Sequence, residues 1–435
     1  MDQRANEDYS HLKDSSKLSG LEKIKFVPLG QKRNAHLSFG GSTRHRYEHF
    51  TNQAWLQGND ENFYSQRFAF HADLVLGKHI RFFNELQHGL KTGGETFLQT
   101  DHLDIHQSFL EVSMINTDSK RFAMRLGRQE IKLGSGRLMD LRIGPNVRRS
   151  FNMTRIYLSN SKINIDAFYG KETPISFKVL DNQFNLFNDN VTSPKTWGVY
   201  SQFSLFQGDH KDEIYYLGFQ SDFSGFNDVL GKEIRHSLGL RRFGTVQARL
   251  TYNSEFIFQF GDLAGRAIRA FNFETDWKYL FSPKQWRPTI GLGLDWSSGD
   301  RKSDDQELNS FNPMFVNPAT YSLAAINTPV NLFSVHPSLF LFPSKKLLIK
   351  CEFATFYRSS AEDGFYSPPR FQSRESNGIS DRHLGNVLGL FLKYTFNESI
   401  NFDLRNSLFL SGDFIQKSGA SASVFQFAPT FNLTF

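Results

Sequence analysis

Hydrophobic and polar positions alternate along most of this 435-residue chain. In the segment 346–358, apolar residues occupy every second position from Leu347 to Phe353, and the charged Lys350 and Glu352 stand between them. Successive side chains of a β-strand point to opposite faces, so the pattern predicts a strand with one apolar and one charged face. A surface strand of a soluble β-sandwich reads the same way, so one such segment does not identify the class of protein.

The whole set of such segments predicts an all-β protein of about eighteen strands. Most of the segments reach the ~9–11 residues that a tilted strand needs to cross a bilayer. The predicted strands are 35–50, 62–77, 79–90, 102–115, 119–133, 152–159, 161–170, 194–206, 212–224, 233–243, 246–258, 266–280, 287–298, 330–342, 346–358, 384–396, 399–411 and 423–435.

The connections between these strands alternate in length. Turn residues at hairpin length occupy 76–79, 116–119 and 397–399, whereas the intervening connections are longer, notably 134–151, 171–193, 299–329 and 359–383. Short turns at one end and long loops at the other are typical of an outer-membrane barrel. We therefore predict a transmembrane antiparallel β-barrel with short periplasmic turns and long extracellular loops, in the outer membrane of a Gram-negative bacterium. An even strand number places both chain ends on the periplasmic side.

The chain ends on the alternating sequence FQFAPTFNLTF. Phe425, Phe427, Phe431, Leu433 and Phe435 would form the lipid face of the last strand, which must pair with the first to leave no open edge. This ending is also similar to the signal read by the bacterial barrel-insertion machinery. We expect that machinery as a partner during biogenesis, and outer-membrane lipid and lipopolysaccharide around the finished barrel.

Composition supports this interpretation. The 46 Phe residues are dispersed among polar neighbours, the mean hydropathy is −0.43, and no apolar run approaches the ~20 residues of a transmembrane helix. The basic residues behind the net charge of +6 are scattered along the chain and mixed with acids, which argues against a nucleic-acid binder.

Residues 1–34 are polar, lack the apolar core of a signal peptide and are expected in the periplasm, while 35–435 are expected to form one barrel domain. If the protein is exported, its signal is absent from this sequence.

Arginine is prominent on the strand faces opposite the lipid. A barrel of this size encloses a lumen, and an Arg facing lipid at mid-bilayer costs ~2–4 kcal/mol. Arg46, Glu48, Arg67 and His71 are therefore expected to face inward. Guanidinium groups can grip carboxylates with two parallel hydrogen bonds. The alternative is a purely structural role, in which these charges keep the lumen face hydrated and stabilise the wall through ion pairs between strands.

The stretch 125–151 is the densest in positive charge. It holds Arg125, Arg128, Lys132, Arg137, Arg142, Arg148 and Arg149, and only Glu130 and Asp140 as acids. Glycines at 134, 136 and 144 break the strand and could let the loop fold inward as a cationic constriction. The alternative is an extracellular loop that binds lipopolysaccharide phosphates. Arg128 shares the parity of the apolar Met124 and Leu126, so it must lie above the lipid zone or follow a bulge at Gly127.

Several stretches carry a family resemblance that spans nearly the whole chain. They are FVPLG (26–30), LSFGGSTRHRYEHF (37–50), QRFAFHADL (66–74), DIHQSFLEV (104–112), GRQEIKLGSGRL (127–138), GPNVRRSF (144–151) and SGDFIQKSG (411–419). With these stretches the chain resembles the alginate-export family of outer-membrane barrels. The resemblance implies an eighteen-stranded monomeric barrel whose arginine-rich lumen passes an anionic polysaccharide. The pore-lining candidates that it implies are Arg46, Glu48, Arg67, His71, Arg125, Arg128, Arg137, Asp140, Arg142, Arg148 and Arg149.

The function expected from these observations is a channel for anionic solutes, with a uronate polymer or acidic oligosaccharide as the leading substrate. Two alternatives stay open: a porin that takes up small anionic nutrients, and a barrel whose loops 299–329 and 359–383 bind a partner. Gly-x-Ser-x-Gly and His-Glu-x-x-His motifs are absent, so no enzyme is predicted. No cofactor and no metal site is predicted either. The direction of transport is not determined by the sequence.

Overall fold

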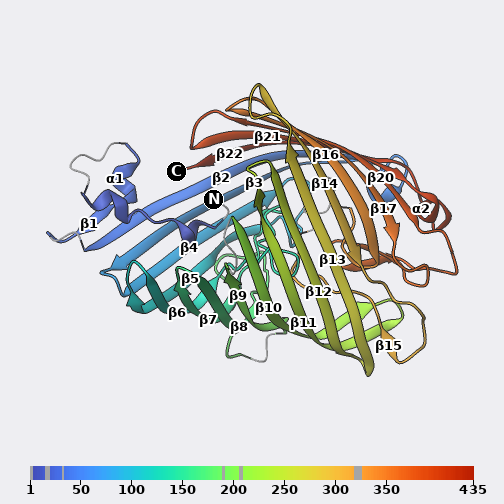
Figure 1. Ribbon diagram of the computed structural model, residues 1–435, viewed down its shortest axis with the longest axis horizontal. Coiled ribbons are helices and arrows are strands. Elements are labelled where there is room, and N and C mark those ends of the chain that lie inside the picture. Colours follow the sequence, from blue (N-terminus) through green and yellow to red (C-terminus); the bar gives the residue numbers. More distant parts are fainter. Residues whose placement is uncertain (1–2, 15–19, 32–33, 189–191, 205–208, 318–325) are drawn as a thin grey trace.

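The computed structural model describes residues 3–14, 20–31, 34–188, 192–204, 209–317 and 326–435. Within these ranges, eighteen antiparallel strands form a closed barrel (Figure 1), which confirms the predicted fold class. The barrel strands are β2 (Ala35–Thr51), β3 (Glu61–Leu76), β4 (Ile80–Lys91), β5 (Asp101–Asn116), β6 (Lys120–Gln129), β7 (Phe151–Asn160), β8 (Ile163–Glu172), β9 (Lys195–Phe203), β10 (His210–Phe226), β11 (Val229–Val246), β12 (Leu250–Leu263), β13 (Arg266–Leu280), β14 (Trp286–Ser297), β16 (Leu332–Ser344), β17 (Leu347–Arg358), β20 (His383–Thr395), β21 (Ile400–Ser411) and β22 (Val424–Thr434).

The barrel closes between its first and last strands. β2 pairs with β22 in a register that runs from Ser42 opposite Thr434 to Thr51 opposite Phe425. Two further hydrogen bonds, of 2.9 and 3.0 Å, join the backbones of Gly41 and Phe435. The apolar end of the chain therefore lies in the wall, where it satisfies backbone groups that would otherwise form an open edge.

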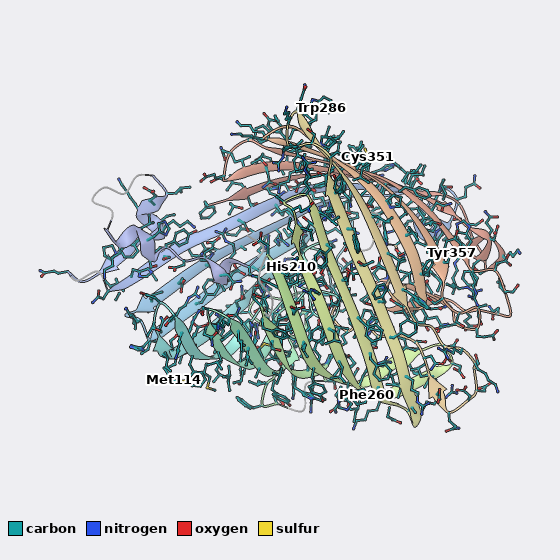
Figure 2. The ribbon with its side chains drawn as sticks, viewed as in Figure 1. Met114, His210, Phe260, Trp286, Cys351 and Tyr357 are labelled. Atoms are coloured by element: carbon teal, nitrogen blue, oxygen red, sulfur yellow. The ribbon has the colours of Figure 1, made fainter. Side chains whose placement is uncertain are left out.

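Alternate side chains of the strands face lipid and lumen, as the sequence pattern predicted. On β12, Phe256, Phe258 and Phe260 are 43, 41 and 37% exposed, whereas Glu255 and Gln259 are buried; of these residues, Figure 2 labels Phe260. Because the outer face carries the large apolar residues, the membrane side of the wall is the outer one.

The connections differ in length at the two ends of the barrel. The periplasmic turns are short, for example 77–79, 117–119 and 345–346, and the loops 130–150, 298–331 and 359–382 at the other end are long. Two outer connections, 227–228 and 264–265, are shorter than the sequence pattern predicted, because β10, β11 and β12 continue beyond their predicted bounds at this end of the barrel. Ala264 and Gly265 have φ of +50° and +90°, the left-handed values that a two-residue hairpin turn requires.

Several short elements complete the fold. They are η1 (Arg4–Asn6), η2 (Ser10–Asp14), α1 (Glu22–Lys25), β1 (Val27–Leu29), η3 (Gln53–Trp55), β15 (Glu307–Leu308), β18 (Phe365–Ser367), β19 (Phe371–Arg374) and α2 (Asp413–Lys417). β1 pairs with the part of β2 that extends past β22, and β15 runs parallel to β13. Among the described residues, none of the helices has the length and apolar character needed to span a membrane.

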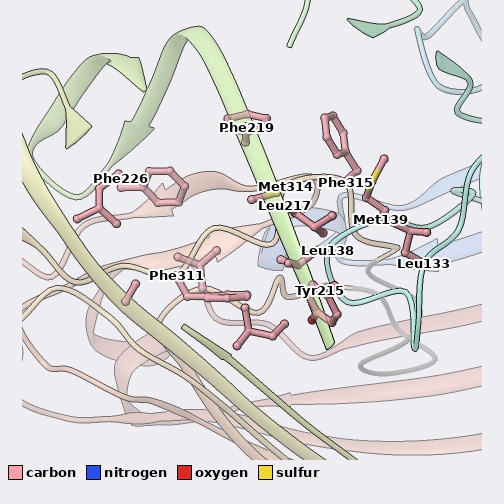
Figure 3. Packing of buried hydrophobic residues seen from close by; sticks show 14 of the residues in the cluster. Leu133, Leu138, Met139, Tyr215, Leu217, Phe219, Phe226, Phe311, Met314 and Phe315 are labelled. Carbon is pink, nitrogen blue, oxygen red and sulfur yellow. The ribbon is translucent and has the colours of Figure 1, made fainter. Parts of the chain in front are cut away.

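The largest apolar cluster lies inside the barrel. Inward residues of β10, such as Leu217 and Phe219, pack against Leu138 and Met139 of the 130–150 loop and against Phe315 of the 298–331 loop (Figure 3). Part of the lumen is therefore filled by a packed core, and the remaining lumen determines where a solute can pass.

Candidate functional site

The 130–150 loop folds into the barrel and reaches the far wall. Arg137 forms ion pairs with Glu274 on β13 and, at 3.5 Å, with Asp295 on β14. The hydroxyl of Ser135 donates to the carboxylate of Glu255 on β12. The glycines on either side of Ser135 have positive φ, which gives the loop the sharp turn it needs there. These contacts fix the tip of the loop on β12, β13 and β14, six to eight strands around the barrel from β6, where the loop begins.

The returning arm of the loop is held by arginines of β2 and β3. Arg44 donates hydrogen bonds of 2.8 and 2.7 Å to the carbonyls of Ile143 and Gly144. Arg46 donates to the Gly144 carbonyl at 2.9 Å, and Arg67 to that of Pro145 at 3.3 Å. Charged donors make stronger hydrogen bonds than neutral ones, so this turn is fastened to the wall rather than free in the lumen.

A second loop locks the first in place. The backbones of Leu138 and Asp140 exchange hydrogen bonds of 2.9 and 3.1 Å with Phe315. The Phe315 ring lies edge-on to Phe151 of β7 and Phe219 of β10, at centroid distances of 4.9 and 5.7 Å. Apolar packing and backbone pairing thus join both loops to the β7–β13 side of the barrel.

A cavity of about 560 Å³ remains on the other side of the lumen. In the described part of the chain, nine of its lining side chains are lysine or arginine and two are aspartate. The basic side chains are Arg4, Arg44, Arg46, Arg67, Lys132, Arg148, Lys350, Lys393 and Arg405, and the acidic ones are Asp140 and Asp403. We call this space the cationic cavity. Its walls are β2, β3, β17 and β20–β22 together with the returning arm of the 130–150 loop.

Most of these cations already have protein partners. Arg148 forms two hydrogen bonds with the Glu130 carboxylate, at 2.6 and 3.0 Å, and Lys350 pairs with Glu352. Lys393 on β20 and Arg405 on β21 differ, because neither makes a hydrogen bond or ion pair with any described residue. The Arg405 guanidinium lies 5.6 Å from the centre of the Phe391 ring. A solute can therefore bind these two cations without displacing a protein partner among the described residues.

Four of the residues predicted from the sequence line the cationic cavity: Arg46, Arg67, Asp140 and Arg148. Glu48 is buried next to them, 3.6 Å from Arg46. His71 lies near Glu7 of the N-terminal segment, at 3.9 Å.

The other predicted residues lie away from this cavity. Arg125 pairs with Glu111 at 2.6 Å and lines a smaller cavity of about 260 Å³. Arg137 is held at the far wall, as described above. Arg142 and Arg149 lie 3.8 and 2.9 Å from the Glu172 carboxylate. Burial, with the neighbouring Arg149, lowers the pKa of the Arg142 guanidinium to about 9, and Glu172 opposes this shift.

Arg128 occupies a position of outward parity above the apolar part of the wall. The pairing of β6 with β7 continues in register to Gln129, so its place does not depend on a bulge. Its guanidinium donates to the carbonyls of Ile105 and Asn182, at 2.7 and 2.8 Å, and to the Asn152 side chain at 3.1 Å. The 173–194 connection covers this side chain, which therefore braces that connection against the wall.

Sequence reasoning did not include Lys393 and left Arg405 out of the candidate list. Arg405 follows Asp403 at the lumen parity of β21, which is the signal that could have found it. Lys393 shares the inward face of β20 with the apolar Phe391, so this strand has no uniformly polar face that the sequence pattern could indicate. Within the described ranges, no group of three or more His, Cys, Asp or Glu side chains could hold a metal ion.

Comparisons with known proteins agree with this architecture. The barrel is similar to OpdO of Pseudomonas aeruginosa (TM-score 0.61, 10% identity, 94% of this chain and 98% of that chain). It is also similar to OccD3 (OpdP) of the same organism (TM-score 0.61, 11% identity, 95% and 93%). A BenF-like porin from Pseudomonas fluorescens Pf-5 gives a TM-score of 0.59 at 12% identity over 92% and 99% of the two chains. At such identities the likeness shows the fold alone.

Sequence comparison defines the family. No curated protein matches this chain. The model of the family described as "Alginate export" matches residues 35–428, which is nearly the whole barrel. The chain belongs to the alginate export family and forms an outer-membrane β-barrel channel of a Gram-negative bacterium.

Proposed function

We propose that this channel passes anionic solutes through the cationic cavity, and that its substrate is a uronate-type polysaccharide or acidic oligosaccharide. The observation that carries the proposal is the excess of nine basic over two acidic side chains around one cavity, counted over the described residues. Like charges that line a low-dielectric passage raise the local concentration of counter-ions. Membership of the alginate export family supports the same substrate class.

Lys393 and Arg405 would make the direct contacts. A uronate polymer carries one carboxylate on each sugar, and a free guanidinium can bind a carboxylate with two hydrogen bonds. The remaining cations are already paired, so they would contribute a field rather than tight binding sites. Conduction requires binding that is strong enough for entry but weak enough for release, and a few free cations within a larger positive field meet that requirement.

A small organic acid is the second candidate substrate. The packed core and the fastened Ile143–Pro145 turn narrow the passage, which suits a solute smaller than a polymer. One solved structure of similar fold is that of OpdK with vanillate, a carboxylate-bearing compound (TM-score 0.58, 11% identity). Because the wall of one barrel encloses the whole cationic cavity, we propose that either substrate passes through a monomer.

Current through the purified protein in a planar bilayer tests the proposal. Under a tenfold KCl gradient, we expect the reversal potential to have the sign of an anion-selective channel. Oligouronates of two to eight sugars, added to one side, should block the current more strongly as the chain lengthens, whereas neutral oligosaccharides of equal length should not block. Block by a small aromatic acid but not by oligouronates would favour the second candidate. Cation selectivity would contradict both.

A further inference from the structure

The polar segment that precedes the barrel packs inside the barrel's periplasmic end. Ala5 is buried against Phe83 of β4 and Phe109 of β5, both inward-facing and almost fully buried. Figure 1 shows this stretch in dark blue beside β2 and β4. A segment that only linked the barrel to the periplasm would have no reason to bury an apolar contact against the lumen wall.

Polar contacts attach the same segment to the last strand and to β3 and β4, which lie close together in the wall. Arg4 donates to the main-chain oxygen of Phe435 at 2.8 Å and forms an ion pair of 2.7 Å with Glu7. Arg81 of β4 donates to the Ala5 carbonyl at 2.8 Å. Glu7 also lies 3.9 Å from His71 of β3. Because β22 pairs with β2, β2 with β3 and β3 with β4, these contacts place the segment along the inner wall beside the seam where the barrel closes.

This position lies between the cationic cavity and the periplasmic turns. Arg4 lines the cationic cavity itself. Ala5 and Asn6 line the smaller cavity that contains Arg125. The following residues, Glu7 to Tyr9, line a cavity of about 230 Å³ that includes the periplasmic turn residues Gly77, Lys78 and His79. The segment therefore borders the cationic cavity and the two smaller cavities that lie toward the periplasmic turns.

We propose that residues 3–14 are a displaceable plug that closes the periplasmic exit of the cationic cavity. The proposal rests on the proposed function only in taking that cavity as the conduction path. Arg4 both holds the plug and faces the cavity, so a carboxylate that arrives there competes with Glu7 for the same guanidinium. Binding of an anionic solute thereby favours the undocked state, since a ligand shifts an equilibrium toward the state that it binds better.

The docked segment contacts Lys25 of α1 through Tyr9 and His71 of β3 through Glu7, and these two side chains fill the space beside Gly40 of β2. An added Cβ at Gly40 of β2 would lie 2.5 Å from Lys25 Nζ and 2.6 Å from the His71 ring, so glycine leaves the room that these side chains occupy. Yet Arg4 Nε, Lys25 Nζ and His71 Nδ1 are buried without a hydrogen-bond partner among the described residues. Buried polar atoms without partners weaken the state that contains them, which suits a plug that has to leave.

Single-channel recording in symmetric KCl tests the plug. The double variant Arg4→Gln/Glu7→Gln removes the ion pair that holds the segment, and deletion of residues 3–14 removes the segment itself. We expect at least a fivefold higher open fraction in both, with longer openings in the deletion. The control is Lys23→Gln/Asp118→Asn, which removes one charge of each sign from exposed positions at the same end and should behave as the parent protein.

The outcomes separate the plug from the proposed substrate. A higher open fraction in the Arg4/Glu7 variant supports the plug whether or not oligouronates block the current. The recorded current is that of K⁺ and Cl⁻, so it does not depend on the identity of the substrate. An open fraction equal to that of the control overturns the plug even if oligouronates do block. If the deletion variant fails to form a heat-modifiable barrel on gels, the double variant, which keeps the full chain, decides.

Discussion

The two sides of the lumen belong to the same barrel, but one is lined by packed apolar side chains and the other by cationic side chains. On the β7–β13 side, inward residues such as Leu217 and Phe219 form a core with two inserted loops. On the side of β2 and β20–β22, inward residues such as Lys393 and Arg405 face a cavity. The alternation of strand side chains fixes which residues point inward, but the character of those residues decides whether a stretch of lumen is filled or left for solute.

The packed side shapes the passage by holding the loops, and the cationic side supplies the charge. Leu138 and Met139 anchor the 130–150 loop in the core, and the same loop presents Ile143–Pro145 to the arginines of β2 and β3. The two sides are therefore coupled through a single loop. Changes in the core should alter the width of the passage, whereas changes in the cavity should alter its selectivity.

The largest effect is expected from Phe315→Ala in the packed core. Removing a buried Phe side chain costs about 3–5 kcal/mol, and here it also removes the contacts with Phe151 and Phe219. We expect the inserted loops to loosen and the unit conductance to rise severalfold, measured in planar bilayers. The lipid-facing Phe258→Ala is the matched control and should leave the conductance unchanged. Equal conductance in the two variants would show that the core does not limit the passage.

A smaller effect is expected from releasing the loop at the cationic side. Arg44→Gln removes charged hydrogen bonds to Ile143, Gly144 and the Asn146 side chain, each worth about 1.5–3 kcal/mol. We expect frequent flickering of the open-channel current. Arg46→Gln removes only one bond to this loop, at Gly144, and should flicker less. If the noise of the Arg46 variant exceeded that of the Arg44 variant, the proposed fastening of the loop would be wrong.

The sequence was sufficient to predict the strands of the barrel wall. It was not sufficient to predict which part of the lumen is filled by a packed core and which part is a cavity. Period-two alternation, the short turns and the Phe-rich ending depend on local geometry and on the lipid, so the strands and the closing pair could be predicted. Arg44 is hydrogen-bonded to carbonyls about a hundred residues away in the chain. A local sequence pattern contains no information about such a contact. Arg44 and Arg405 both point from strands into the cationic cavity, yet Arg44 is hydrogen-bonded to a loop, whereas Arg405 makes no hydrogen bond or ion pair with a described residue.

The smallest effect is expected from salt. The Debye length falls from about 10 Å at 0.1 M to about 3 Å at 1 M ionic strength. Since several cations of the cavity act on a solute only through their field, block by oligouronates should weaken by about twofold over this range, measured as the blocking concentration. Block that is independent of salt would indicate that direct contacts at Lys393 and Arg405 carry all of the binding.

Cysteine modification tests most directly whether solutes pass along the cationic side. The single cysteine of the chain, Cys351, faces outward, so Cys351→Ser provides a background in which Lys393→Cys and Leu217→Cys can be compared. With a bulky anionic methanethiosulfonate reagent, we predict a rapid and lasting fall in current for Lys393→Cys and no change for Leu217→Cys. A fall in current only at Leu217→Cys, or unchanged current after modification at Lys393→Cys, would contradict the account.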